Sequence, residues 1–424
     1  MKLSKFHIVI IALSFSILAG FIITDLLKFR KITKSIINNQ EVINTDRPVP
    51  PEYQIPPAPE FDPNKPEIVC RYLPVVEEEI QESNDSSKIQ KNIGYENNKV
   101  GIYIYAEVED FADLANELVN SNGGDWGYVL VPYNVKDYDD GKWNTLFENL
   151  SKNHLIPIIQ LWDLDLDEDK RDKEIISSAK FLNTLEWPIK NRYISAYNEV
   201  NYKRFWKGNI NPKEYAEVLD KTISTFKDLN ENFFIMNGAF NASARTGPGY
   251  LDEETFLIRM NDAVPGIFKR LDGWASHHYP QPNFSASPNG YGRDSIRAYE
   301  WELDILRRRF NVTNLPVFIT ETGWAHKETD GNDSSSQYKL DKYKVADNIK
   351  YAFEKVWLPD DRIVAITPFT IKYDPPYDHF SWVTANNNPY PQFEAVKSIE
   401  KIKGKPQIVK YYKSKEVVCE YWST

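Results

Sequence analysis

Ten residues from Leu315 to Trp324 read Leu-Pro-Val-Phe-Ile-Thr-Glu-Thr-Gly-Trp. The apolar run at the start has the length of a strand and is rich in branched and aromatic residues, which predicts a strand buried on both faces. The run stops at Glu321. A glutamate in that place is either a solvated strand terminus or a group held at the strand end for chemistry.

A second stretch of the same form makes the chemical interpretation worth testing. Residues 192–201 read Arg-Tyr-Ile-Ser-Ala-Tyr-Asn-Glu-Val-Asn, a buried run that closes on Asn198 and Glu199. If both strands belong to one parallel barrel, their carboxyl ends open into the same bowl. The two glutamates are then a candidate pair.

Regular alternation of strand and helix patterns over residues 100–404 predicts the fold class. Eight strands, each followed by a helix, imply an α/β fold with a closed TIM (β/α)8 barrel. The rival is an open doubly wound sheet, which would usually have a Gly-rich turn after its first strand, and residues 106–110 contain no glycine. The expected strands are 100–106, 128–132, 155–162, 192–198, 233–240, 271–278, 315–321 and 363–371, and the expected helices are 111–120, 143–150, 172–185, 212–229, 253–260, 296–309, 338–357 and 393–402.

The chain before the barrel differs in composition. Residues 6–23 contain no Asp, Glu, Lys or Arg and are flanked by basic residues, which fits a signal anchor better than a cleaved signal peptide. The basic flanks nearly cancel, so they do not decide orientation. We expect the barrel outside the cytoplasm, tethered to the membrane, or secreted if the segment is cleaved. The expected parts are a membrane anchor at 1–34, a Pro-rich linker at 35–66, a strand and loop at 67–99, the barrel at 100–404 and an extension at 405–424.

The two cysteines lie one on each side of the barrel. In an exported chain, Cys70 and Cys419 could form a disulfide that joins the extension to residues 67–76. The alternative is two unrelated buried thiols, and the sequence does not choose between them.

The overall composition excludes some partners. A net charge of −10 and a pI near 5.3 argue against nucleic-acid binding, which needs a basic face. Aromatic residues make up 14% of the chain, enough to supply both a core and flat surfaces for sugar rings. No metal-ligand motif and no Gly-x-Ser-x-Gly elbow is present, so we expect no cofactor and see no sign of a required protein partner.

Two facing carboxylates are what glycosidic bond cleavage requires. One donates a proton to the leaving oxygen, and the other attacks the anomeric carbon or activates water. Asn198-Glu199-Val200-Asn201 and Thr320-Glu321-Thr322-Gly323-Trp324 resemble the strand-four and strand-seven signatures of the clan A glycoside hydrolases, which include cellulases and 1,3-glucanases. The resemblance covers the whole barrel. It implies that Glu199 is the general acid/base and Glu321 the nucleophile, with retention of configuration.

The resemblance also implies helper residues. Asn198 would bond the 2-hydroxyl of the attacked sugar, and of the histidine pair at the end of strand six, His278 is preferred over His277 for a place near the nucleophile. A hydroxyl donated by Tyr279 to Glu321 would keep that carboxylate ionised. Further candidate ligands are Trp324 and Trp382 as sugar platforms and Asp163 and Asp165 as hydroxyl ligands. Trp162, Trp206 and Trp274 are weaker candidates for sugar platforms, because core packing explains each of them at least as well.

The sequence departs from the clan pattern at two strands, where an arginine after strand two and a histidine after strand three are missing. These gaps bear on which family this is. The function predicted is a retaining glycoside hydrolase acting on a β-linked poly- or oligosaccharide. The alternatives are an inactive barrel that binds glycans as a membrane-tethered module, and an anchored scaffold without sugar chemistry.

Overall fold

The structure is a computed structural model that describes residues 67–78, 97–108, 110–328 and 338–422. The predicted membrane anchor at 1–34 and the Pro-rich linker at 35–66 lie outside the described residues. Within the described ranges, no helix is both long and apolar enough to cross a membrane. The domain boundaries and the anchor therefore stay predictions.

In the described chain, eight parallel strands form the central sheet, and the predicted alternation of strands and helices is confirmed. Five strands pair in the order β2-β3-β4-β5-β6 and three in the order β7-β8-β9. Parallel bridges from Met236 to Gly273 and from Val100 to Ile366 join the two sets, so the sheet closes on itself. The strands are β2 (Gly101–Tyr103), β3 (Gly127–Asn134), β4 (Leu155–Trp162), β5 (Arg192–Asn198), β6 (Phe233–Ala239), β7 (Trp274–His277), β8 (Val317–Glu321) and β9 (Ile363–Ile366).

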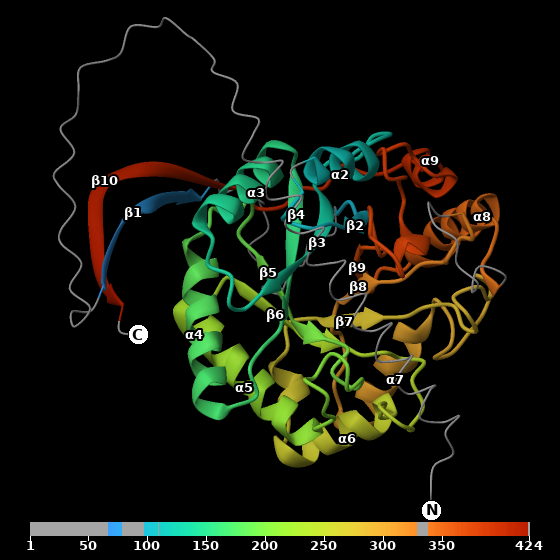
Figure 1. Ribbon diagram of the computed structural model, residues 1–424, viewed down its shortest axis with the longest axis horizontal. Helices are drawn as coiled ribbons and strands as arrows, with labels where there is room; N and C mark the ends of the chain where they lie inside the picture. The colour runs from blue at the N-terminus through green and yellow to red at the C-terminus, as the bar shows by residue number, and fades with distance from the viewer. Residues whose placement is uncertain (1–66, 79–96, 109, 329–337, 423–424) are drawn as a thin grey trace, which may run out of the picture. The chain divides into compact units, whose positions relative to one another are not determined.

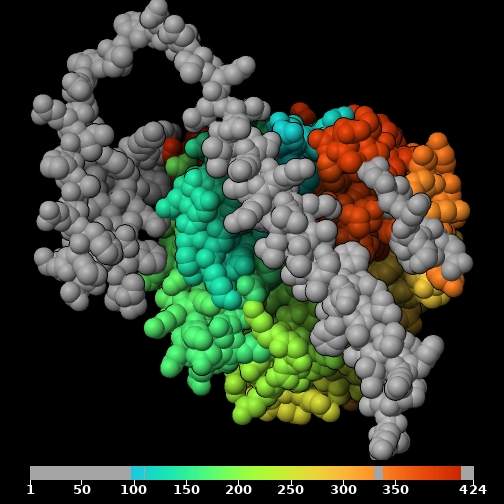
Figure 2. Space-filling model, viewed as in Figure 1, coloured from blue at the N-terminus to red at the C-terminus, as the bar shows by residue number. Residues whose placement is uncertain are grey.

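Helices surround these strands, as Figure 1 shows. In the space-filling view the colour passes from green through yellow to orange and red around the molecule, because the chain winds once around the barrel (Figure 2). The helices are α2 (Phe111–Val119), α3 (Asp140–Lys152), α4 (Glu168–Thr184), α5 (Pro212–Leu229), α6 (Glu253–Ala263), α7 (Ala298–Phe310), α8 (Lys342–Ala352) and α9 (Pro391–Lys397), with short turns η1 (Ile267–Arg270), η3 (Phe353–Trp357) and η4 (Asp378–Phe380).

Capping residues set where helices begin. The side chain of Asp167 accepts from the N–H of Lys170, so α4 starts earlier than its apolar spacing predicts. Asn211 caps α5 in the same way and Pro212 takes the first helical position, where its missing N–H costs nothing.

Two apolar clusters make up the core, one inside the barrel and one between the strands and the surrounding helices. Alternate residues of β3 show the division: Tyr128 and Leu130 belong to a lumen cluster inside the barrel, whereas Val129 and Val131 pack in an outer cluster with the helices. Every strand is therefore covered on both faces, as the continuous apolar runs predict.

The ends of the described chain form a separate two-stranded sheet of β1 (Glu67–Glu78) and β10 (Val409–Trp422). Cys70 lies on β1 and Cys419 on β10. The disulfide between them stays a prediction. Just before β10, Ile408 bridges to Ile189 of the barrel.

Candidate active site

Two strand ends bring the predicted glutamates to one rim of the barrel. Glu321 is the last residue of β8, and Glu199 follows directly after β5. Glu199 has a backbone φ of 36° and donates its N–H to the carbonyl of Ala239, at the end of β6. This local turn fixes the direction in which the carboxylate leaves the strand.

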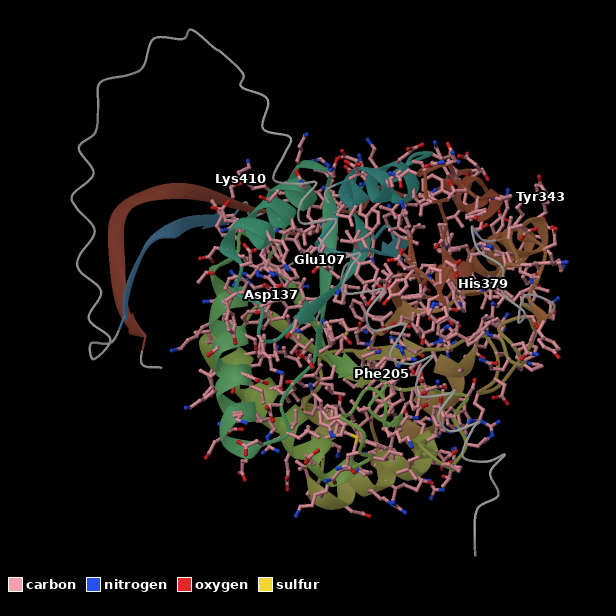
Figure 3. All side chains as sticks on the ribbon, viewed as in Figure 1. Glu107, Asp137, Phe205, Tyr343, His379 and Lys410 are labelled. Atoms are coloured by element: carbon pink, nitrogen blue, oxygen red, sulfur yellow. The ribbon has the colours of Figure 1, made fainter. Side chains whose placement is uncertain are left out.

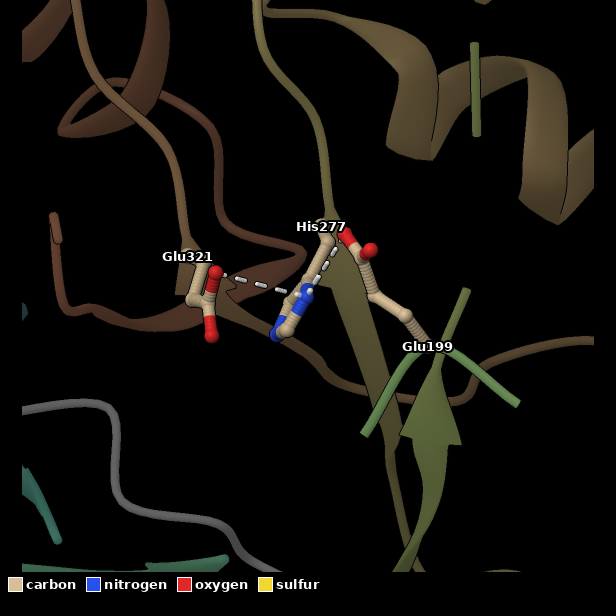
Figure 4. Close-up of side chains that lie close together, drawn as sticks. All are labelled: Glu199, His277 and Glu321. Atoms are coloured by element: carbon tan, nitrogen blue, oxygen red, sulfur yellow. Dashed lines mark ion pairs between the residues drawn. The ribbon is translucent and has the colours of Figure 1, made fainter. Parts of the chain in front are cut away.

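The two glutamates meet around a histidine. His277, the last residue of β7, lies between them in Figure 4. Its Nδ1 is 3.6 Å from Oε1 of Glu199 and 3.7 Å from Oε2 of Glu321. One ligand atom from each of the three residues lies within 4.8 Å of the others. The trio could coordinate a metal ion, and it is the only such cluster found among the described residues, but its two carboxylates also suit metal-free chemistry.

Burial and mutual charge perturb these groups. Burial raises the pKa of Glu321, and the charge of Glu199 raises it further, while His277 and Tyr279 act in the opposite direction. Burial alone would lower the pKa of His277, but the charges of Glu321 and Glu199 outweigh it and raise that pKa. Neither ring nitrogen of His277 has a hydrogen-bond partner in the described chain. The two carboxylates therefore favour the charged form of His277 over the neutral one.

Neighbouring side chains hold the carboxylates. The hydroxyl of Tyr279 donates to Oε2 of Glu321 at 2.9 Å. Asn241 reaches Oε2 of Glu199 at 3.5 Å. Asn198 accepts a hydrogen bond from Gln160 at 3.3 Å and lies on the cavity wall beside the pair. The structure thus brings together Glu199, Glu321, Asn198 and Tyr279 of the residues predicted from the sequence.

The predicted helper His278 does not lie in this group. Its ring is fully buried on the outer face of the sheet, where Nδ1 shares a hydrogen bond with the hydroxyl of Ser276 at 3.0 Å and the ring packs near Tyr299. Burial lowers its pKa to about 3, which keeps the imidazole neutral. His277 takes the place expected for His278 because successive side chains on a strand point to opposite faces.

The two predicted tryptophan platforms also lie elsewhere. Trp324 is 2% exposed and donates its indole N–H to the carbonyl of Ala286 at 2.8 Å. Trp382 is 3% exposed and packs in the outer cluster. Neither lines the cavity at the glutamates, so both belong to the core.

The two aspartates considered as possible sugar ligands, Asp163 and Asp165, have partners within the protein. Asp163 pairs with Lys136 and Lys207 and lines a neighbouring cavity. Asp165 accepts from the N–H of Asp167 at the start of α4 and does not contact the glutamates.

Aromatic side chains supply most of the cavity, which has a volume of about 360 Å³. The sequence interpretation missed them, although Tyr103 is the last residue of β2 and Phe369 lies three residues beyond the end of β9. An aromatic residue at or near the carboxyl end of a strand was the sequence feature that could have identified these cavity residues. The lining beside Glu199, His277, Glu321, Asn198 and Tyr279 is Tyr103, Tyr105, Tyr202, Arg204, Phe205, Asn241, Ser243, Tyr250, Gln281, Phe284, Phe369, Tyr373, Tyr377 and Phe380.

Solved glycoside hydrolases have a similar fold. A monomeric β-xylosidase from Caulobacter crescentus is 15% identical, with a TM-score of 0.52 over 77% of this chain and 70% of that chain. An endo-β-1,3-glucanase from Pseudomonas viridiflava is 16% identical (TM-score 0.46, 72% and 98% covered), and an endo-laminarinase from Formosa is 15% identical (TM-score 0.47, 73% and 91% covered). No protein-family profile and no curated protein matches the chain. The likeness to the xylosidase shows a shared barrel fold.

Proposed function

We propose that this chain is a retaining glycoside hydrolase that cleaves a β-linked poly- or oligosaccharide by double displacement. The observation that supports it most is that one carboxylate oxygen of Glu199 and one of Glu321 lie within 4.8 Å of each other beside His277. Retaining enzymes hold their two carboxyl groups roughly 5–5.5 Å apart, whereas inverting enzymes need about 6.5–9.5 Å for an intervening water. The short separation favours direct attack by a carboxylate.

In the first step, an oxygen of Glu321 attacks the anomeric carbon while Glu199 gives its proton to the glycosidic oxygen. The bond from the anomeric carbon to the leaving oxygen breaks, and a covalent ester to Glu321 forms. In the second step, Glu199 takes a proton from water, and that water's oxygen displaces Glu321 from the anomeric carbon. Two inversions give net retention.

The surrounding groups suit these roles. Tyr279 donates to the carboxylate of Glu321 and so favours the ionised form that attacks. Asn198 lines the cavity with Glu199, and we assign it the hydrogen bond to the 2-hydroxyl of the attacked sugar, an interaction that strengthens in the transition state. The tyrosines and phenylalanines of the wall offer flat apolar faces to a sugar ring.

A barrel that binds glycans without turnover is the alternative, and it has no use for two carboxylates held this close together. The fold shared with a β-xylosidase also supports hydrolysis over simple binding. The sugar and its linkage are left open by this proposal.

The test is hydrolysis of a panel of aryl β-glycosides by the wild type and by Glu321→Gln, with the anomeric form of the first product followed by proton NMR. We expect a β product and a loss of at least about 10⁴-fold in kcat for Glu321→Gln. Glu217→Gln, on the exposed face of α5, is the matched control and should keep full activity. An initial α product, or full activity in Glu321→Gln, would rule the mechanism out.

We further propose that residues 6–23 tether the enzyme to a membrane with the barrel outside the cytoplasm. The uncharged apolar run and the following Pro-rich stretch support this. Fractionation of the full chain against one starting at residue 67 tests it, and recovery of both in the soluble fraction at their full size would contradict it.

A further inference from the structure

A second cavity of about 440 Å³ adjoins the one that holds the glutamates. The two share part of their walls, so they lie side by side. Figure 3 labels Glu107, Asp137 and Phe205, which line the second cavity from three separate loops and lie toward the middle of this face. The shared wall residues are Tyr103, Tyr105, Asn198, Arg204, Phe205 and Tyr373.

An exposed tryptophan marks the second cavity. Trp162 is the last residue of β4, and its side chain is 46% exposed, in contrast to the buried indoles of Trp143, Trp187 and Trp274. Its backbone is held firmly, because β4 pairs with β3 up to Trp162 and its carbonyl accepts from the N–H of Val135. A half-exposed indole on a cavity wall, attached to a firmly held strand end, is a ready platform for an amphipathic ring.

Polar groups around the indole are balanced in charge. Asp163 pairs with Lys207 and Lys136, and Asn134 donates to the same carboxylate at 3.2 Å. Asp137 and Glu107, which also line this cavity, both pair with Lys142. The cavity thus offers many hydrogen-bonding groups beside an aromatic face with little net charge, which suits a neutral sugar better than an ionic ligand.

The contacts of the two cavities give the direction of the chain. Glu199 and Glu321 both line only the first cavity, which puts the scissile bond there, whereas Asn198, assigned to the attacked sugar, lines both cavities. The second cavity therefore lies on the non-reducing side of the scissile bond.

We propose that the second cavity binds further sugar units of the glycone, with one ring stacked on Trp162, so that the enzyme acts on chains and not on single terminal sugars. This inference rests on the proposed function. It names Trp162 as the residue that sets the required chain length.

The test uses 4-nitrophenyl β-glycosides with one, two and three sugar units, in a β-1,3-glucose and a β-1,4-xylose series. The leaving group is the same throughout, so only the glycone side changes. The readout is the ratio of kcat/KM for the trioside to that for the monoside. We expect a ratio of at least about ten in the wild type, a tenfold or larger fall in Trp162→Ala, and a smaller fall in Trp162→Phe, which keeps an aromatic face.

The matched control is Tyr343→Ala, an aromatic that is 64% exposed on α8 and lies at the outer edge in Figure 3; its ratio should equal that of the wild type. Circular dichroism checks the fold of each variant, and Trp162→Phe serves alone if Trp162→Ala does not fold. A wild-type ratio near one, or a ratio unchanged by both Trp162 substitutions, overturns this inference while leaving the hydrolase proposal intact. Absence of nitrophenol release from every glycoside overturns the proposed function instead.

Discussion

Replacing Tyr279 by phenylalanine removes a single hydroxyl, which donates to Oε2 of Glu321 at 2.9 Å. Both residues are partly buried. The pKa of Glu321 is already raised, by burial first and by Glu199 second, and the Tyr279 hydroxyl is one of the groups that oppose this rise. Its removal must raise the pKa of Glu321 further, because the ionised form loses a donor that the protonated form needs less.

The size of the effect follows from the strength of a hydrogen bond to a charged group, about 1.5–3 kcal/mol. That energy corresponds to a pKa change of about 1–2, at about 1.36 kcal/mol for a pKa change of one. Since the nucleophile must be ionised, the acidic limb of the kcat/KM profile should move to higher pH by about 1–2 pH units. Below that limb, kcat/KM should fall by roughly 10–100-fold at any fixed pH, because the ionised fraction there falls about tenfold each time the pKa of Glu321 rises by one.

The assay is the pH dependence of kcat/KM on one aryl β-glycoside, from pH 3 to pH 9. Tyr299→Phe is the matched control, because its hydroxyl makes an equivalent bond of 2.8 Å to Asp360 but lies outside the cavity. That variant should leave the acidic limb in place. A Tyr279→Phe limb that stays where it is, or that moves to lower pH, would refute the assignment of Glu321 as the group that must ionise.

Three further predictions follow from the site and the core. Glu199→Gln should lower turnover of unactivated oligosaccharides by about 10²–10⁴-fold, but should lower the first-turnover burst of dinitrophenyl glycosides far less, since that leaving group needs no proton; equal losses would contradict the acid role. Trp382→Ala should lower stability by about 3–5 kcal/mol in urea unfolding, as expected for a core indole, with KM unchanged; a raised KM at native stability would restore it as a sugar platform. Burial raises the pKa of Glu302, fully buried beside Glu253, from 4.5 to about 7, so stability present below pH 4.5 is lost as the pH rises to about 7. The urea concentration at the unfolding midpoint should therefore change less between pH 4.5 and pH 8 in Glu302→Gln than in the wild type. The same change in both proteins would show that Glu302 keeps its ordinary pKa.

The barrel and the position of the catalytic pair could be predicted because each depends on a pattern that repeats along the chain. A buried run followed by a polar residue marks the carboxyl end of a strand, and the parallel arrangement sends every such end to the same rim. Glu199 and Glu321 needed no further information to be brought together. Their distance from His277 depends on the local turns after β5 and β8, such as the positive φ at Glu199, which the sequence pattern does not reveal.

The choice between His277 and His278 depends on which face of β7 turns inward. Ala275 belongs to the lumen cluster and Trp274 to the outer cluster, so alternation along the strand sends His277 inward and His278 outward. In a sheet with water on one face, the polar residues would show which face is which. In this barrel both faces are apolar, and alternation in the sequence gives two equally good answers.

The same ambiguity explains why aromatic residues were harder to place than carboxylates. A buried carboxylate is costly unless it has a purpose, so a glutamate at the end of an apolar run is informative by itself. An indole is stabilised by burial wherever it packs, so the sequence at Trp324 and Trp382 is as compatible with a place in the core as with a sugar-binding role. Only exposure separates the two uses. Trp162 is half exposed at a strand end on a cavity wall, and this is why the structure, and not the sequence, singles it out.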